Sequence, residues 1–295
     1  FGLSGSGKST LTHAKHDDKY DIEVLHDDAF VISVEDGSSV ALEPSYFDKT
    51  NDYPAGHREQ DYFVTVQNCG VTLDENGRKV LVTEDIRNGN GRTIKSRYST
   101  PNRVDKIQEP IQSIFWIMKD DALPPLVKIT DPRLASILGC TLMTKRSTAE
   151  NTGAGANLDA LVIEPYANPF RVYPLVEDYE KFKALFDKGV DCYIINTGDF
   201  LGKKVTKEVS LGVIETVVDG KANFELFGGL PGMEYLPVEG YEVPDMNGEY
   251  AELIRDRMQF RLDYLKAFND ANPEHQIPQD ALESIKTIER FIDVL

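Results

Sequence analysis

The first ten residues contain the residue types and the spacing of a phosphate-binding loop. Residues 2–9 read Gly-Leu-Ser-Gly-Ser-Gly-Lys-Ser and fit the pattern G-x-x-x-x-G-K-[ST]. Glycines let the backbone curl so that successive N–H groups point inward and form a nest for an anion. The side chain of Lys8 can then reach the outer phosphates, and the hydroxyl of Ser9 can ligate the Mg²⁺ that bridges them. The pattern predicts a nucleotide site; the alternative is a glycine turn before a helix.

Each residue of this segment is a candidate for contact with the nucleotide phosphates. The candidates are Gly2, Leu3, Ser4, Gly5, Ser6, Gly7, Lys8, Ser9 and Thr10. A helix that starts near Lys8 would add the positive end of its dipole to the same site.

Two adjacent carboxylates, Asp27 and Asp28, follow a short β-prone run at residues 22–25. Carboxylate oxygens are preferred ligands of Mg²⁺ and Mn²⁺, so an aspartate at a strand end beside the loop is a candidate metal ligand. Neighbouring side chains on a strand point to opposite faces, so at most one of the two needs to face a metal. A solvated turn is the alternative. His26, directly before the pair, is a candidate for a supporting or packing role.

Phosphoryl transfer also needs a cation for the charge that develops on the transferred group. Arg92, Arg97 and Arg103 lie close together in the sequence. Arg97 is favoured because the segment 96–99 comes shortly before a proline, which restricts the backbone. Lys145 and Arg146 form a further basic point. For both groups the alternative is an exposed basic loop.

The elements that would position these residues form a mixed α/β chain, with strands early and helices late. Hairpins are predicted from residues 30–32 and 40–42, and from residues 63–73 and 79–82 around an Asn-Gly turn. The apolar runs 114–118 and 192–195 predict buried strands, the first of them central in its sheet. Helices are predicted at residues 10–15, 131–141, 177–188, 206–219, 247–269 and 278–294.

Composition excludes several classes of protein. The 295 residues are 41% hydrophobic and carry a net charge of −17, which argues against sequence-independent nucleic-acid binding. No apolar run approaches the roughly 18 residues that span a bilayer. The three cysteines are widely scattered and suit a reducing compartment, so we expect a cytoplasmic protein.

The loop normally follows a buried strand, and here only Phe1 precedes Gly2. We therefore expect residues 1–295 to be the nucleotide-binding, carboxy-terminal domain of a longer protein. On this expectation, an amino-terminal lobe and the first strand of the domain lie upstream of Phe1.

Six segments, in order along the chain, resemble motifs of the ATP-dependent phosphoenolpyruvate carboxykinases. Residues 2–9 resemble the family's G-L-S-G-T-G-K-T, 25–28 its I-G-D-D, 96–101 its T-R-x-x-Y-P, 122–125 its G-V-L-P-P, 139–145 its S-G-x-T-A-K, and 195–198 its V-N-T-G. The agreement in order covers the first two thirds of the chain. The resemblance implies a P-loop-containing, carboxykinase-like carboxy-terminal domain with a helical end.

The resemblance also implies a reaction and the residues that carry it. Oxaloacetate loses CO₂, and the enolate takes the γ-phosphoryl group of ATP to give phosphoenolpyruvate and ADP, a step of gluconeogenesis. By resemblance, Lys8 and Arg97 are the catalytic residues: Lys8 stabilises the transferring phosphoryl group, and Arg97 bridges it to the charge of the substrate. Ser9 binds the nucleotide-associated Mg²⁺, and Asp28 is a ligand of the second cation, Mn²⁺, which polarises the enolate oxygen.

The sequence departs from the family at several points. The family's adenine-side run T-E-R-G-x-T-E-P has no clear counterpart, and Asn151 stands at its arginine, for which Arg146 could substitute. His26 stands where the family has glycine. The family's remaining metal ligands and its substrate-carboxylate arginine lie upstream of the loop, so we expect the isolated chain to bind nucleotide weakly without turnover. The alternatives are another P-loop kinase, such as a phosphocarrier-protein kinase, and a non-catalytic nucleotide-binding homologue.

Overall fold

A computed structural model describes most of the chain. The described residues are 1–3, 5–26, 28–43, 45–49, 70–82, 92–96, 102–145 and 160–294, with the backbone alone for 45–49 and 92–96. The chain divides into two compact units. The larger unit comprises Phe1–Tyr20, Ser33–Ser38 and Glu109–Leu295, and the smaller one comprises Asp21–Ile32 and Ser39–Gln108.

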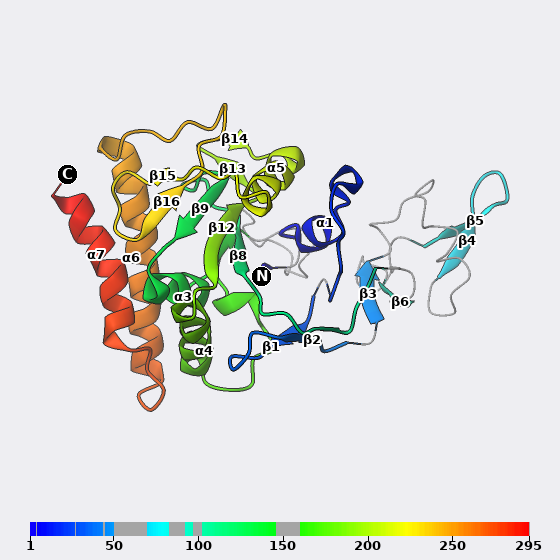
Figure 1. Cartoon of the computed structure of the whole chain (residues 1–295), viewed down its shortest axis with the longest axis horizontal. Helices are drawn as coiled ribbons and strands as arrows, with labels where there is room; N and C mark the ends of the chain where they lie inside the picture. The colour runs from blue at the N-terminus through cyan, green and yellow to red at the C-terminus, as the bar shows by residue number, and fades with distance from the viewer. Residues whose placement is uncertain are drawn as a thin grey trace. The chain divides into compact units, whose positions relative to one another are not determined.

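A mixed five-stranded sheet forms the centre of the larger unit (Figure 1). Its strands, in spatial order, are β15 (Glu225–Leu226), β16 (Met233–Tyr235), β9 (Leu126–Ile129), β12 (Asp191–Asn196) and β8 (Ser113–Met118). β12 runs parallel to β8, and the other pairs are antiparallel. The mixed sheet with helices at the carboxy-terminal end confirms the predicted α/β class.

Side chains of β8 alternate between two covered faces of this sheet. Ile117 packs in a cluster with residues of α5 (Lys207–Val218), and Leu11 of α1 (Lys8–Thr12) joins the same cluster. Trp116 is fully buried on the opposite face, where its ring contacts Phe182 and Phe186 of α4 (Leu175–Asp187). Continuous apolar runs form such strands because both faces are shielded from water.

The predicted central position of the run 114–118 is wrong. β8 is buried, but it stands last in the order of the sheet, and β12 has a neighbour on each side. The backbone of Phe1 covers the outer edge of β8. The Phe1 amino group donates to the Phe115 carbonyl at 2.8 Å, and Ile117 N–H donates to the Phe1 carbonyl at 2.7 Å. A single apolar run does not reveal which strands lie on either side of it.

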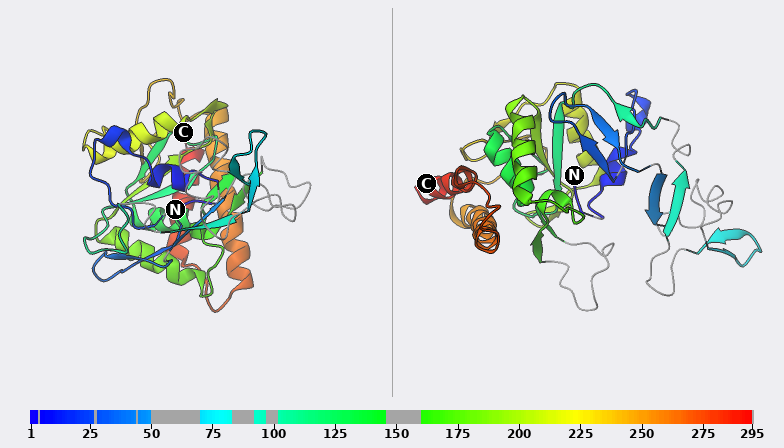
Figure 2. Two further views of the ribbon diagram at one scale, coloured as in Figure 1. Left: turned by 90° about the vertical axis from the view of Figure 1, so that its right-hand side faces the viewer. Right: turned by 90° about the horizontal axis from the view of Figure 1, so that it is seen from below.

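The predicted helices are present, with one shortened. The later helices are α3 (Pro132–Cys140), α4, α5, α6 (Gly248–Ala271) and α7 (Gln279–Asp293). α1 ends at Thr12 rather than at residue 15, and a tight turn, η1 (His16–Asp18), follows with left-handed φ angles. Figures 1 and 2 show α6 and α7 side by side, and α7 packs against α3.

Short strand pairs complete the larger unit. β10 (Met143–Lys145) pairs with β11 (Leu161–Ile163), and β13 (Asp199–Phe200) pairs with β14 (Lys203–Lys204). A further tight turn, η4 (Pro165–Ala167), follows β11. The sequence pattern predicted none of these pairs, because runs of two or three residues carry no usable periodicity.

The smaller unit is built from hairpins. One sheet contains β1 (Phe30–Ile32), β2 (Ser39–Ala41) and β7 (Lys106–Ile107); the other pairs are β3 (Ser45–Lys49) with β6 (Arg92–Ser96) and β4 (Val71–Leu73) with β5 (Lys79–Leu81). These pairs confirm the first predicted hairpin and the end of the second around its Asn-Gly turn. Residues 63–69, the start of the second hairpin, lie outside the described residues.

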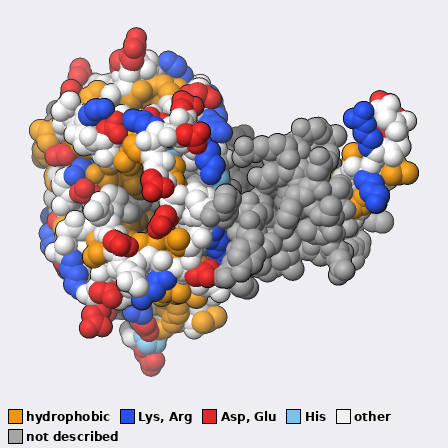
Figure 3. All heavy atoms as spheres, turned by 45° about the vertical axis from the view of Figure 1, so that its right-hand side comes forward, with side chains coloured by type: hydrophobic (Ala, Val, Ile, Leu, Met, Phe, Trp, Pro, Cys, Tyr) orange, Lys and Arg blue, Asp and Glu red, His pale blue; other side chains and the backbone are white. Residues whose placement is uncertain are grey.

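Acidic and basic side chains are interspersed over the coloured surface of the larger unit in Figure 3. The net charge of −17 is consistent with this mixed, solvated surface. Among the described residues, none of the helices is both long and apolar enough to cross a bilayer.

Candidate nucleotide-phosphate site

Three chain segments of the larger unit run parallel and end at one edge of its sheet. β12 is parallel to β8, and the two hydrogen bonds of Phe1 to β8 are those of a parallel bridge. The loop at residues 2–7 follows Phe1 and therefore meets the residues that follow β8 and β12. Ligands of α/β proteins bind outside the carboxyl ends of parallel strands, so this edge is the expected place for a nucleotide.

Two glycines allow the loop to take its shape. A Cβ atom on Gly2 would lie 2.4 Å from the Ser6 Oγ and 2.8 Å from the Ile117 Cβ, so a side chain would collide with the loop and the sheet. Gly7 caps α1 with a φ of 106°, a left-handed conformation that is strained for other residues. The glycine spacing of the motif therefore has a steric cause in this fold.

The loop presents donors that an anion could use. Within the described part of the chain, the backbone N–H groups of Gly5 and Gly7 donate to no acceptor. Ser9 and Thr10 lie exposed on the first turn of α1, where helix N–H groups point towards the loop. Unsatisfied N–H groups at such a turn are the physical basis of phosphate binding.

Two lysines hold the loop carbonyls. The Lys8 Nζ donates to the Gly2 carbonyl at 2.8 Å and lies 3.5 Å from the Leu3 carbonyl. The Lys119 Nζ, from the residue after β8, donates to the Gly5 carbonyl at 2.7 Å. Both ammonium groups therefore lie at the loop, close enough to exchange a carbonyl partner for a phosphate oxygen.

Asn196 and Thr197 tie the sheet edge to the loop. The Asn196 side chain is fully buried; its Nδ2 donates to the carbonyls of Asp120, Leu123 and Asp199 at 2.9, 2.6 and 2.9 Å. Its Oδ1 accepts from Gly198 N–H at 2.9 Å.

The Thr197 hydroxyl donates to the Ser6 carbonyl at 2.7 Å, and the Lys204 Nζ donates to the Thr197 carbonyl at 3.1 Å. Ser6 itself is 3% exposed, and its Oγ has no hydrogen-bond partner among the described residues. Ser6 is thus buried and its carbonyl is hydrogen-bonded to Thr197, while the N–H groups of Gly5 and Gly7 have no acceptor in the part of the chain that the structure describes and can donate to a ligand.

Several predicted site residues lie outside the described part of the chain. These are Ser4, Asp27, Arg97 and Arg146. The other predicted loop residues, from Gly2 to Thr10, are brought together as described above. Asp28 belongs to the smaller unit, so its predicted role stays a prediction.

Within the smaller unit, His26 shapes the turn that carries Asp28. His26 is 5% exposed, and its Nδ1 accepts from the N–H groups of Asp28 at 3.0 Å and Ala29 at 3.1 Å. Its Nε2 lies 3.6 Å from the Glu43 carboxylate. An accepting Nδ1 requires the ring hydrogen on Nε2, facing that carboxylate. His26 therefore has a supporting role towards the Asp28 backbone.

Arg103, one of the three clustered arginines, is a structural residue of the same unit. Its guanidinium is buried and donates to the Glu43 carbonyl at 2.6 Å, and it lies 3.8 Å from the Asp105 carboxylate. Its backbone forms a bridge with Val24.

A cation at the loop would have a suitable first ligand. The exposed Ser9 hydroxyl at the start of α1 is a hard oxygen donor of the kind that Mg²⁺ takes together with phosphate oxygens. Among the described residues, no three side chains of His, Cys, Asp or Glu come together as a ready-made metal site.

The sequence pattern did not single out Lys119, Thr197 and Lys204 as site residues. Lys119 and Thr197 directly follow the ends of β8 and β12. A polar residue directly after a buried parallel strand is the signal that could have identified the first two. Lys204 carries no such signal, because its approach to Thr197 depends on the β13–β14 hairpin.

The chain is similar to proteins of a known family over most of its length. The sequence model of the family described as phosphoenolpyruvate carboxykinase matches residues 1–246. The phosphoenolpyruvate carboxykinase (ATP) of Aeropyrum pernix is 24% identical over 292 aligned residues, which cover 88% of this chain and 55% of that protein. The chain thus spans about half the length of the curated relative that it matches.

Proposed function

Because the chain belongs to the phosphoenolpyruvate carboxykinase family, we propose that it carries the nucleotide site of an enzyme that converts oxaloacetate and ATP into phosphoenolpyruvate, CO₂ and ADP. The observation that carries the proposal is the loop at residues 2–9. It lies at the carboxyl edge of parallel strands with two lysines against it. A P-loop-containing, carboxykinase-like domain is part of the same proposal.

The loop would bind the β- and γ-phosphates of ATP. The N–H groups of Gly5 and Gly7 donate to phosphate oxygens, and Lys8 leaves the Gly2 carbonyl to follow the γ-phosphoryl group. Lys119, at the Gly5 carbonyl, supplies a second positive charge to the loop. Stabilising the charge of the transferring group in this way lowers the barrier without any covalent step on the protein.

Cations and two further arginines complete the proposed site. Ser9 would hold the Mg²⁺ that accompanies the nucleotide, and Asp28 would be a ligand of Mn²⁺. When bound, these cations neutralise phosphate charge and polarise the oxygen of the enolate. Arg97 would bridge the phosphoryl group and the substrate, and Arg146 would contact the nucleotide.

The reaction is proposed for the whole protein, because the chain spans about half the length of the curated relative. We propose that residues 1–295 act as its nucleotide-binding domain together with an amino-terminal lobe that supplies the remaining substrate and metal ligands. Its place would then be in gluconeogenesis, with oxaloacetate and ATP as small-molecule substrates, in the cytoplasm.

An assay of the protein at its natural length tests this proposal. Formation of phosphoenolpyruvate should require oxaloacetate, ATP and Mn²⁺ together, and Lys8→Ala should abolish it because the transferring phosphoryl group loses its cation. Lys183→Ala is the matched control, since this lysine pairs with Asp187 on α4 and should leave turnover unchanged. ATP consumption without oxaloacetate dependence would instead indicate another kinase. A folded protein that binds ATP and turns over neither substrate would indicate a non-catalytic homologue.

A further inference from the structure

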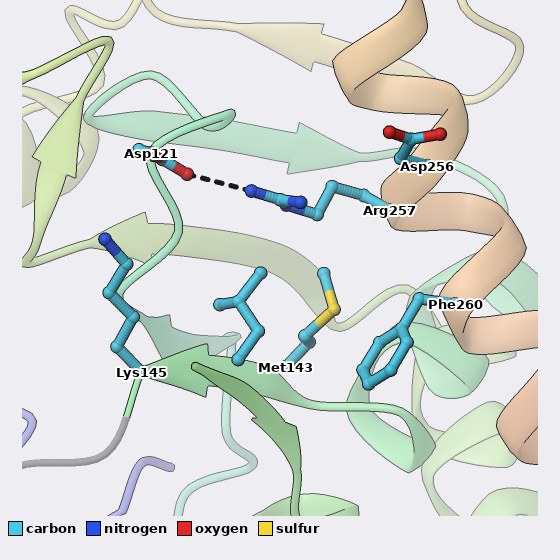
Figure 4. A pocket seen from close by; sticks show the side chains of 7 residues that line it. Asp121, Met143, Lys145, Asp256, Arg257 and Phe260 are labelled. Carbon is cyan, nitrogen blue, oxygen red and sulfur yellow. Dashed lines mark hydrogen bonds and ion pairs between the residues drawn. The ribbon is translucent and has the colours of Figure 1, made fainter. Parts of the chain in front are cut away.

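A cavity lies in the larger unit, between the β10–β11 hairpin and α6 (Figure 4). Its volume is about 480 Å³, within the range of small-molecule sites. α6 begins at Gly248, two residues beyond the end of the family match at residue 246. One wall of the cavity therefore comes from a helix that the family model does not cover, and the proposed reaction makes no use of it.

Arg257 of α6, paired with the carboxylates of Asp120 and Asp121, forms the floor of the cavity. Arg257 donates from Nε to the Asp120 carboxylate and from a terminal nitrogen to the Asp121 carboxylate, both at 2.9 Å. Asp120 is fully buried, and its second oxygen has no hydrogen-bond partner in the part of the chain that the structure describes. Figure 4 shows the Arg257–Asp121 pair crossing the cavity.

A second arginine lies directly behind this floor. Arg261 is 2% exposed and donates to the Arg257 carbonyl at 3.0 Å. Its terminal nitrogens lie 3.7 Å from the Met143 sulfur and 3.8 Å from the Met118 sulfur, and its Nε has no hydrogen-bond partner in the described ranges. Burial lowers the pKa of Arg261 to about 10, so the side chain is still a cation at neutral pH. The charges at the floor are thus two arginines, Arg257 and Arg261, and two carboxylates, Asp120 and Asp121.

The lining of the cavity combines an unpaired cation with apolar walls. The Lys145 ammonium has no hydrogen bond or ion pair to any described residue, and it extends into the cavity in Figure 4. Met143 and Leu161 form an apolar wall, and Phe260 is 46% exposed at the rim. Asp256 also lines the cavity, but it lies exposed on α6, where water solvates its carboxylate.

We propose that this cavity binds a small organic anion, whose charged group pairs with Lys145 and whose apolar body packs on Met143, Leu161 and Phe260. An ammonium beside an apolar wall favours a ligand that has an anionic group and an apolar body. A ligand with only one of these would leave either the ammonium or the apolar wall without a partner. The floor itself is close to neutral, because Asp120 and Asp121 offset the charges of Arg257 and Arg261, so the Lys145 ammonium is the group that selects an anion.

Anilinonaphthalene sulfonate is a suitable probe, since it joins one sulfonate to flat apolar rings. Its fluorescence titration of the wild-type chain should show one saturable site. Lys145→Gln should raise the dissociation constant about tenfold, the loss expected for one charge-assisted hydrogen bond. Phe260→Ala should raise the dissociation constant about fivefold, because the ligand loses contact with the ring. The substitution should not disturb folding, since the side chain is exposed.

Two matched controls separate this cavity from general surface binding. Lys181→Gln removes an exposed lysine of α4, and Phe170→Ala removes an aromatic ring that is 85% exposed elsewhere in the unit. Both should leave the dissociation constant unchanged. Equal affinity in the wild type, Lys145→Gln and Phe260→Ala would overturn the proposal, as would equal losses in the controls.

Competition with MgADP decides whether the cavity is a separate site. The probe should stay bound at saturating MgADP if the cavity is independent of the loop. Displacement of the probe would show that the cavity belongs to the nucleotide site, and it would overturn the proposal of a second ligand.

Discussion

At the scale of single residues, the hydrogen bonds of the loop already place its donors where a phosphate group would bind. Lys8 and Lys119 are held at loop carbonyls, while the N–H groups of Gly5 and Gly7 have no acceptor among the described residues. The phosphates of a bound nucleotide would accept hydrogen bonds from the two ammonium groups and the two N–H groups. Water would then solvate the loop carbonyls that the lysines leave. Little rearrangement of the backbone is then needed on binding, which keeps the ordering cost of the ligand low.

Asn196 is the residue whose replacement should disturb the sheet edge most. In Asn196→Asp a carboxylate oxygen replaces the Nδ2 and faces three carbonyl oxygens in a fully buried place. We expect a loss of about 3 kcal/mol or more in the free energy of unfolding, because three acceptors lose their donor and a charge is buried. Urea unfolding measures this loss.

Asn168→Asp is the matched control for that experiment. Asn168 uses its Oδ1 to accept from Phe170 N–H, and aspartate keeps that acceptor. The free energy of unfolding should change by no more than about 0.5 kcal/mol. Similar losses in the two variants would show that the three bonds of Asn196 contribute little.

At the scale of elements, parallel strand ends and helix caps position the site. β8 and β12 end beside each other, and their following residues, Lys119 and Thr197, both reach the loop. α3 begins behind the sheet with Asp131 as its cap, whose Oδ1 accepts from the N–H groups of Arg133 and Leu134 at 2.9 Å each. A side-chain cap of this kind stabilises the first turn of the helix.

The cap of α3 should make stability depend on pH. Burial alone would raise the pKa of Asp131, but the hydrogen bonds from Leu134 and Arg133 and the Arg133 charge outweigh it and lower the pKa below 3.8. The stabilisation is therefore complete above about pH 3.8 and is lost as the pH falls through the lowered pKa. Asp131→Ala should cost about 1 kcal/mol at neutral pH. The gap between the wild type and this variant should narrow in acid, as measured by urea unfolding across the pH range.

Asp131→Asn provides the control, because it keeps the acceptor and removes the titrating group. Its stability relative to Asp131→Ala should be independent of pH. A gap between wild type and Asp131→Ala that stays constant down to acid unfolding would contradict the assigned role of the charge.

The secondary structure that the sequence predicts correctly is the part with long hydrophobic patterns. The helices from α3 to α7 and the strands β8 and β12 have apolar periodicity or long apolar runs, and their predictions are confirmed. Strands of two or three residues, such as β13 and β14, carry no such pattern, and the sheet order depends on contacts between distant segments.

The candidate site divides in the same way. The loop was readable because its glycines, lysine and serine are contiguous in the sequence. Lys119 and Thr197 were missed because they reach the loop only through the pairing of β8 with β12. The roles of Asp28, Arg97 and Arg146 stay predictions.

At the scale of the whole molecule, the predicted site residues are divided between the two compact units. The loop, Lys119 and Thr197 belong to the larger unit, and Asp28 with its supporting His26 belongs to the smaller one. The larger unit contains most of the buried apolar side chains, so it is the stable frame on which the phosphate loop is built.

The most direct test is to follow the glycine amides by two-dimensional ¹H–¹⁵N NMR during a titration with MgADP. The amide signals of Gly5 and Gly7 should shift strongly, because their N–H groups become donors to phosphate oxygens. Those of Gly77 and Gly220, which also have positive φ but lie in other turns, should stay in place. Binding of MgADP with the Gly5 and Gly7 signals unmoved would contradict the claim that this loop holds the phosphates.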